Sequence, residues 1–349
     1  MSKRKRRLGL LAVPVALALA LVSTAAAGIT PLFSATTTAD ATVMSYSQQP
    51  GDDPIAALTF FVPVDYAALL AQPEGEVVGT ITADAIAADL ANTPLALKGT
   101  IVAGTAATTI TSSGQSVTLG AAATACTGTA THSAYWVMNL SAAGQTLQVP
   151  AYVDDVPLTV SLSAIANNTI TICLPPPDVP VGTPGRASLG AKLVGATLNI
   201  TDVFSAAPAW YTWHARVTPY TPGTGKVNAA GTFEVQSVDR TPQVLTTKAK
   251  KSKTAGKVTV SGRLIAGGKG VAGASVNILA GKKSVGKATT KAGGYYAVTV
   301  KAPGTAKFSA SVTVAPKKAA SCTTFFAPAP CAGAWVAGFT AKSTPVKAS

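Results

Sequence analysis

The amino-acid sequence predicts an all-β protein built as tandem antiparallel β-sandwiches of the Ig-like or prealbumin-like kind. Many short segments alternate apolar and polar residues with a period of two, which is the pattern of half-buried strands. These segments are rich in Thr, Val and Ile and are separated by Gly, Pro and Asn turns. Helical patterns are scarce. Short strands in such number, separated by such turns, are typical of sandwiches.

The sequence also predicts where the helices and strands lie. A short helix is expected over 82–94, because Thr82 or Asp84 can cap its start and Asn92 ends it before a proline. Two strands are expected within 321–343, joined across a cysteine loop, so the last domain runs to residue 349. Period-two alternation predicts further strands at 157–163, 168–174, 196–204, 231–238, 257–264, 295–300 and 307–316.

The first 27 residues have the layout of a secretory signal peptide. A basic start is followed by a fifteen-residue apolar run, 8–22, and by small residues that end at Ala27. The alternative is an uncleaved anchor, but the run is shorter than the roughly 18 residues of a spanning helix. We therefore expect cleavage after Ala27, a secreted or extracellular location, and no transmembrane segment in the mature chain.

Four cysteines remain after this cleavage, and an even number predicts two disulfides in an oxidising compartment. Four cysteines allow three pairings. Proximity in the sequence favours Cys126 with Cys173 and Cys322 with Cys331. A metal site is not expected, because neither histidine lies beside a cysteine.

Charge divides the chain into two parts. Residues 28–240 contain 6 basic and 14 acidic residues, whereas residues 241–349 contain 16 lysines, one arginine and no acidic residue. Such a split predicts different partners for the two parts, or one part that faces an anionic surface. The stretch 241–256 is rich in lysine and lacks an apolar period, so it predicts a linker. The expected order is a signal peptide at 1–27, an acidic β-sandwich region at 28–240, this linker, and a basic domain at 257–349.

The basic domain resembles a known module. Its segment 258–302 holds Gly-Gly turns at 267–268 and 293–294, and the second turn leads into a Tyr-Tyr pair. Glycine supplies the positive φ that such turns need. With the strand "VNILAGK" between them, these turns make the segment similar to the carboxypeptidase regulatory-like, or transthyretin-like, domain of secreted bacterial proteins. The resemblance implies an accessory module without catalysis. Lys291 and Ala292 replace the acidic residues that are usual at this turn, so calcium is not expected there.

Aromatic residues of the acidic part gather in the segment 210–220. On a strand, side chains alternate between the two faces, so Tyr211 and Trp213 would share one face. One interpretation is a platform for sugar rings. The other is a core on one face and a rim on the other. The candidate ligand-contact residues are Trp210, Tyr211, Trp213, His214 and Arg216.

Patterns of catalysis and of cofactor binding are missing from the sequence. It contains no G-x-S-x-G elbow, no phosphate loop and no G-x-G-x-x-G. The adjacent Asp154 and Asp155 would point to opposite faces of a strand. We therefore expect no enzyme activity and no cofactor. Nucleic acid is not expected as a partner, because of export and because the basic part has one arginine, the usual reader of bases.

The sequence thus predicts a secreted, non-enzymatic bacterial cell-envelope or extracellular protein. The basic part is expected to attach it to an anionic cell-wall polymer, a polysaccharide or a membrane surface. One alternative is a carbohydrate-binding protein that uses the segment Trp210 to Tyr220. Another is a basic part whose charge only keeps the protein soluble. The candidate surface contacts are Lys248, Lys250, Lys251 and Lys253.

Overall fold

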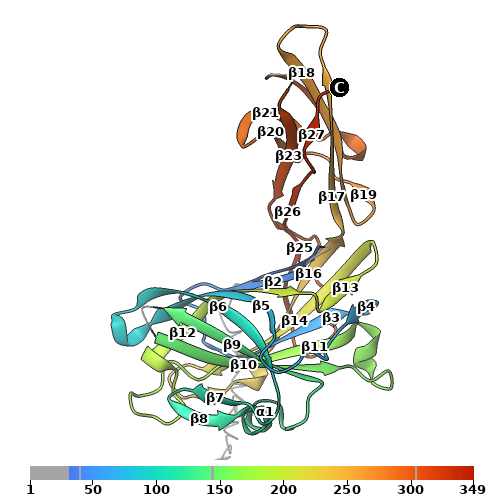
Figure 1. Cartoon of the computed structure of the whole chain (residues 1–349). Coiled ribbons are helices and arrows are strands. Elements are labelled where there is room, and N and C mark those ends of the chain that lie inside the picture. Colours follow the sequence, from blue (N-terminus) through green and yellow to red (C-terminus); the bar gives the residue numbers. More distant parts are fainter. Residues whose placement is uncertain (1–30, 39–40, 143–144, 303–304) are drawn as a thin grey trace, which may run out of the picture.

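The computed structural model describes residues 31–38, 41–142, 145–302 and 305–349. These residues form an all-β protein of two units, one beyond the other along the long axis (Figure 1), which confirms the predicted fold class. The predicted signal peptide, 1–27, lies outside the described residues. Among the residues that are described, no helix is long and apolar enough to cross a membrane.

One long sheet builds the amino-terminal unit. Its neighbouring strands are antiparallel, except that β16 and β25 run parallel. The alternate side chains that face inward form one core, which includes the fully buried Phe33, Phe60, Trp136 and Trp213. Over the described residues the order is β1 (Leu32–Thr37), β2 (Ala41–Ser47), β12 (Ala191–Thr201), β5 (Val77–Ala87), β6 (Thr93–Gly104), β9 (Ala134–Ala142), β10 (Gln145–Asp155), β11 (Ala166–Cys173), β3 (Ile55–Pro63), β14 (Ala209–Thr221), β16 (Phe233–Thr241), β25 (Cys331–Val336) and β24 (Lys317–Lys318), with β15 (Lys226–Val227) beside β14.

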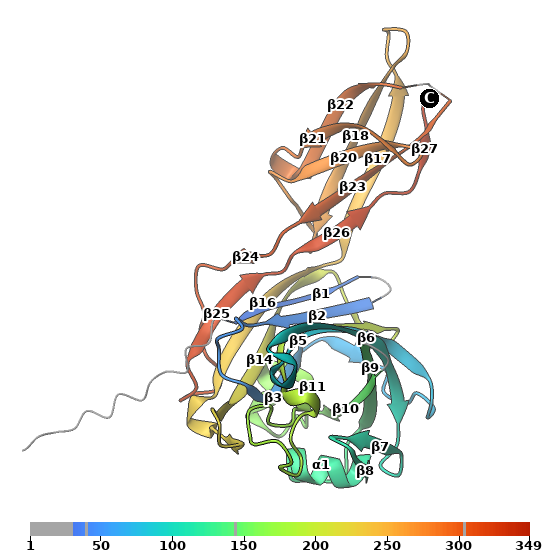
Figure 2. The ribbon, with the colours of Figure 1, turned by 90° about the vertical axis from the view of Figure 1, so that its left-hand side faces the viewer.

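This sheet curls until β1 lies against β16 (Figure 2). Side chains of β16 bind the backbone of β1 and so close the curled sheet. The Ala35 amide donates to Oγ of Ser237 at 2.9 Å, and the Thr37 amide donates to Oδ2 of the buried Asp239 at 2.8 Å. These two backbone donors at the edge of β1 are therefore satisfied by side chains of β16 and not by another strand, and this contact closes the curl around one core.

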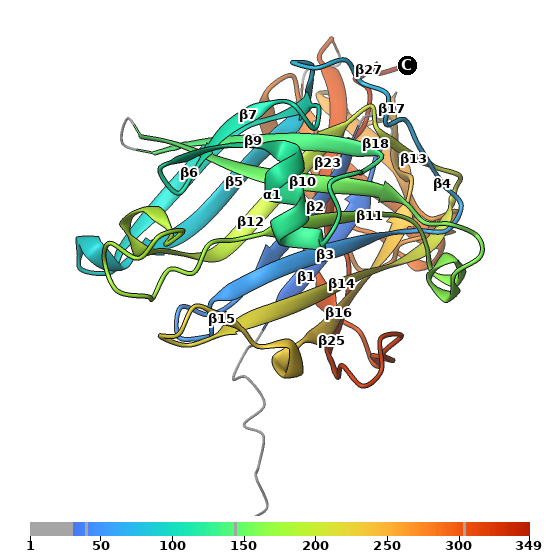
Figure 3. The same cartoon turned by 90° about the horizontal axis from the view of Figure 1, so that it is seen from below.

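Short elements cover the outside of the curled sheet. The hairpin of β7 (Thr109–Ser112) and β8 (Gln115–Thr118) leads into α1 (Leu119–Thr127), which lies across β9 and β10 (Figure 3). Thr118 caps the helix by accepting from the Ala121 amide, and Gly128 ends it at a φ of 82°. A separate two-stranded antiparallel sheet pairs β4 (Tyr66–Ala68) with β13 (Phe204–Ala206), which lie far apart in the sequence.

The carboxy-terminal unit is a β-sandwich with its own core, centred on Val260, Leu264, Ile278 and Phe308. One sheet holds β17 (Gln243–Lys251), β18 (Lys257–Ala266), β19 (Lys269–Gly270) and β22 (Tyr295–Lys301). The other holds β21 (Lys283–Thr289), β20 (Ser275–Ala280), β23 (Lys307–Val314), β26 (Phe339–Lys342) and β27 (Val346–Lys347).

The predicted borders need two corrections. The expected linker at 241–256 is wrong, because most of it is β17, in which Leu245, Thr247 and Ala249 are buried. The segment 317–336 does not belong to the basic domain, because β24 and β25 join the amino-terminal sheet. Among the described residues, the chain therefore crosses between the units three times, at 241–243, 314–317 and 336–339.

Two predicted elements are also wrong. The segment 82–94 forms no α-helix, because Ala83, Ala85 and Ala87 alternate toward the core on β5, which η1 (Ala88–Leu90) joins to β6. The segment 157–163 forms no strand but runs through a turn into η2 (Ser161–Ala164). The other expected strands lie in or overlap β11, β12, β16, β18, β22, β23, β25 and β26, and the remaining short helices are η3 (Ser188–Gly190), η4 (Ala229–Gly231) and η5 (Ala292–Gly294).

Candidate functional site

Both predicted disulfides are confirmed. Cys126 near the end of α1 pairs with Cys173 at the end of β11, with their Cα atoms 5.8 Å apart. Cys322 pairs with Cys331, which begins β25. We call residues 322–331 the disulfide loop. The first bond ties α1 to the curled sheet, and the second closes a loop that packs on the outer face of β14.

The predicted aromatic segment lies on β14, and the structure divides its side chains between the two faces. Tyr211 and Trp213 face the core, where they are 8% and 0% exposed. Both rings meet Tyr66 edge to face, and Trp213 Nε1 donates to the Tyr66 hydroxyl at 3.4 Å. Because these rings are covered by protein, the second interpretation holds for them: Tyr211 and Trp213 are core residues and not a platform for sugar rings.

His214 lies on the other face of β14, but the disulfide loop covers it. The ring is next to Phe325 and Phe326, and its Nδ1 lies 2.5 Å from Oε1 of Glu234. Glu234 is fully buried and accepts four further hydrogen bonds. They come from Gln236 Nε2 at 2.7 Å, Thr324 Oγ1 at 2.9 Å, and the amides of Phe325 at 2.8 Å and Phe326 at 3.4 Å. This carboxylate therefore anchors the disulfide loop to the sheet.

The electrostatics of Glu234 follow from these contacts. Burial raises the pKa of the carboxyl group, but the hydrogen bonds from His214, Gln236, Phe325 and Thr324 outweigh burial and lower the pKa to about 2. The group is thus ionised in the folded protein at neutral pH. No pattern in the sequence pointed to this cluster, because its members lie on three segments that only the fold brings together.

The other two predicted contact residues are exposed, and they lie at different places. Arg216 lies over the ring of Phe326, with its guanidinium carbon 5.5 Å from the ring centre. Trp210, which is 50% exposed, lies at the junction of the two units, where Arg240 and Lys269 approach its ring to 5.9 and 5.2 Å. The five candidates therefore do not form one surface.

One series of hydrogen bonds between side chains resembles a catalytic triad. His132 Nδ1 lies 2.8 Å from Oδ2 of Asp154, and its Nε2 lies 3.0 Å from Oγ1 of Thr127. The Thr127 hydroxyl also lies 3.0 and 3.1 Å from the carbonyl oxygens of Ala123 and Thr129. The His132 side chain is only 1% exposed, next to the rings of Tyr135 and Tyr152. These hydrogen bonds therefore tie the end of α1 to β10.

The lysines of the basic part are all exposed, and they are not evenly distributed. The strand ladders place Lys257 opposite Lys301 and Lys307 opposite Lys347, at the end of the unit farthest from the curled sheet (Figure 1). The turn from β17 to β18 and the turn from β20 to β21 lie at this same end. We call its nine lysines the distal lysine cluster: Lys250, Lys251, Lys253, Lys257, Lys282, Lys283, Lys301, Lys307 and Lys347.

Three of the four predicted surface contacts belong to this cluster, whereas Lys248 lies earlier on β17, nearer the curled sheet. The sequence identified them as a local run, but it did not show that lysines of four later segments join them. Comparison of the chain with protein families, with curated proteins and with solved structures found no match. Function is therefore inferred from geometry and charge.

Proposed function

We propose that this chain is a secreted, non-enzymatic envelope or extracellular protein that attaches to an anionic surface polymer through the distal lysine cluster. The observation that carries the proposal is the gathering of nine exposed lysines at one end of a unit that contains no acidic residue. The resemblance of this unit to accessory β-sandwich modules supports an attachment role.

Two contacts within the cluster favour an external anion. Lys257 lies directly opposite Lys301, and Lys307 lies directly opposite Lys347. Like charges that face each other across a strand pair destabilise the sheet. Residues 241–349 contain no Asp or Glu side chain that could offset this repulsion. A polymer with repeated negative groups would offset it, and binding to the folded state alone would stabilise the unit.

The distribution of charge between the two parts of the chain also favours binding through the distal lysine cluster. Residues 28–240 have a net charge of −8, and residues 241–349 have a net charge of +17. An anionic surface therefore repels the curled sheet and attracts the distal cluster, which would steer the approach of the molecule.

The test uses the full chain and isolated anionic wall polymer in a sedimentation assay. We expect retention at low salt and release as salt rises, because exposed charges are screened within about 8 Å at physiological ionic strength. Substitution of Lys251, Lys253, Lys257, Lys283 and Lys301 by Gln is expected to abolish most of the retention. It should not lower the melting temperature, since these side chains are exposed.

A matched control removes the same number of charges elsewhere on the basic part. Gln at Lys248, Lys287, Lys291, Lys317 and Lys342, which are also exposed, is expected to leave most of the retention. Equal loss in both variants would show that only net charge matters, and retention that salt does not weaken would contradict the electrostatic proposal. Vesicles with and without anionic lipid separate a membrane surface from a wall polymer.

A further inference from the structure

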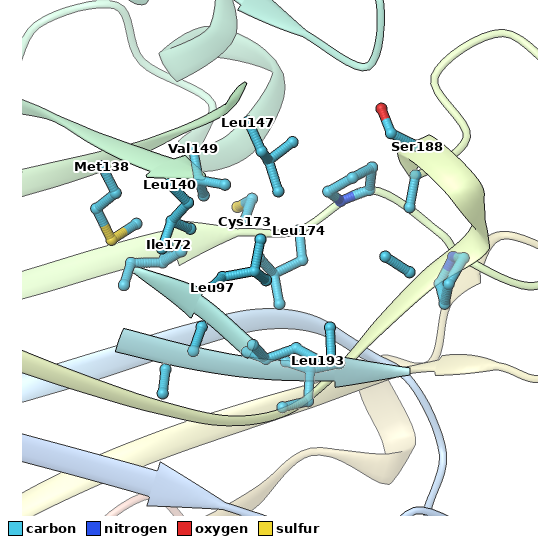
Figure 4. Close-up of a pocket in the computed structure, with 18 of the residues that line it drawn as sticks. Leu97, Met138, Leu140, Leu147, Val149, Ile172, Cys173, Leu174, Ser188 and Leu193 are labelled. Atoms are coloured by element: carbon cyan, nitrogen blue, oxygen red, sulfur yellow. The ribbon is translucent and has the colours of Figure 1, made fainter. Parts of the chain in front are cut away.

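The curled sheet lines a partly open cavity of about 100 Å³ near one end of its core (Figure 4). The side chains that line it come from β3, β5, β6, β9, β10, β11 and β12, so rigid strands define its walls. The labelled aliphatic side chains of Figure 4 converge on a shared space: Leu97, Met138, Leu140, Leu147, Leu174 and Leu193.

The lining is mostly aliphatic, and none of its residues is aromatic. Most of its strand residues are Leu, Ile, Val, Met and Ala, and the others on these strands are Gln148, Pro150, Cys173 and Lys192. Water is held in cavities by two to four polar partners, and these walls offer very few. Protein interiors are otherwise packed about as densely as organic crystals, so a space of this size forgoes favourable contacts. An aliphatic guest would restore those contacts.

The polar rim lies where several loops meet. Ser112 ends β7, Ser113 follows it in the turn to β8, and Ser188 comes from η3 (Figure 4 shows Ser188 at the edge of the space). A proline-rich segment, 174–187, forms another part of the rim. Arg186 fixes this segment by donating to both carboxylate oxygens of Asp89, at 2.7 Å each.

One cation belongs to the same lining. Lys192 donates from Nζ to the carbonyl oxygens of Pro50 and Asp52. An ammonium group has three N–H donors, so one remains for another acceptor. Basic residues are rare in this part of the chain, at six among residues 28–240, and a cation beside an apolar cavity suits an anionic head with an apolar tail.

We propose that the curled sheet binds a single-chain amphiphile, with its unbranched alkyl tail among the leucines of the cavity and its carboxylate at the rim beside Lys192. The volume is of the order of the roughly 150 Å³ of an apolar cavity that takes up benzene, so the enclosed part accommodates the last few carbons of the tail. The rest of the chain extends toward the rim.

The binding assay uses the delipidated full chain and a dansyl-labelled undecanoic acid, with dodecanoate as the competitor. We expect saturable one-to-one binding with enhanced, blue-shifted dansyl emission. Affinity is expected to rise about fourfold for each methylene added between hexanoate and decanoate, since each is removed from water. Much of this binding is expected to persist in about 1 M salt, where the screening length is about 3 Å. Attachment through the distal lysine cluster is lost under that condition, so the two proposals can fail separately.

Substitutions that fill the cavity provide the structural control. Leu147→Trp and Ala196→Phe are expected to abolish saturable binding, because both positions line the cavity. Leu158→Trp is the matched control, since Leu158 is 87% exposed and outside the lining. Lys192→Gln is expected to weaken dodecanoate and to leave dodecanol unchanged. Absence of saturable probe binding to the full chain, or full binding by folded Leu147→Trp, would overturn the proposal.

Photolabelling tests the site without any substitution, should the filled variants not fold. A diazirine on the terminal carbon of the fatty acid is expected to label peptides from β9, β10 or the start of β12. Labelling confined to the lysine-rich end, or spread evenly over the chain, would overturn the assignment of the cavity.

Discussion

Glu234 provides a quantitative test of how the disulfide loop is held. The pKa of this carboxyl group falls from 4.5 to about 2 in the folded protein, because its hydrogen bonds outweigh the effect of burial. Since the folded-state pKa lies below the unfolded one, the ionised group contributes stability that is complete above about pH 4.5 and is lost as the pH falls through 2. The interval between the two values corresponds to about 3 kcal/mol of unfolding free energy.

The measurement is urea unfolding of the full chain between pH 7 and pH 2, followed by tryptophan fluorescence. In Glu234→Gln, an amide NH₂ replaces one acceptor oxygen and faces donors. At neutral pH we therefore expect the unfolding free energy of the amino-terminal unit to fall by about 3 kcal/mol. The variant is also expected to lose the part of the wild-type pH dependence that lies below pH 4.5.

Glu76→Gln is the control, because Glu76 is exposed and the substitution is the same. It is expected to leave both the neutral-pH stability and its pH dependence close to wild type. If Glu234→Gln kept the wild-type slope between pH 4.5 and pH 2, Glu234 would not be the group that links stability to pH, and the reasoning would be refuted.

Two further predictions concern the disulfide and the junction. Replacement of Cys126 and Cys173 by Ser opens a loop with a sequence separation of 47. The unfolding free energy of the amino-terminal unit, measured from its calorimetric transition, is expected to fall by about 4 kcal/mol. An equal fall for the carboxy-terminal unit would contradict the description of two separate cores. Gly267→Ala and Gly268→Ala both place a side chain at positive φ, and each is expected to cost about 1 kcal/mol for that reason. Only the Cβ added at 267 meets Trp210, at 2.6 Å. The melting temperature of Gly267→Ala is therefore expected to fall further than that of Gly268→Ala, and its tryptophan emission is expected to shift. Identical behaviour of the two variants would refute the contact.

Features that depend on local pattern could be predicted from the sequence. Strands such as β18 and β22 alternate large apolar side chains with polar ones, so their period and their faces are evident. The disulfides followed from proximity along the chain. The charge border near residue 240 also lies close to where the core of the second unit begins, at Leu245.

Local pattern failed where the alternating residues are small or where pairing is distant. On β17 the buried positions include Thr247 and Ala249 between exposed lysines, and this weak apolar signal looked like a linker. On β5 the residues buried at alternate positions are alanines, whose high helix propensity favoured a helix over a strand. The parallel pairing of β25 with β16 joins residues about one hundred positions apart, and no short-range signal encodes it.

Most of the candidate sites could not be predicted for the same reason, because they depend on residues that are far apart in the sequence. The cavity depends on seven strands, and the distal lysine cluster depends on ladders that bring separate turns to one end. By contrast, the aromatic segment was conspicuous in sequence because it is rich in large rings. Large rings are also what a core needs, so conspicuousness did not distinguish binding from packing.

The triple crossing between the units has a mechanical consequence. A single linker would bear all the tension on a molecule pulled by its basic end while its curled sheet was held. Here three segments bear it in parallel, and one of them, β25, lies between β16 and β24. Pulling β25 along its own axis loads its backbone hydrogen bonds together in shear, so the connection resists extension more strongly than bonds that open one after another.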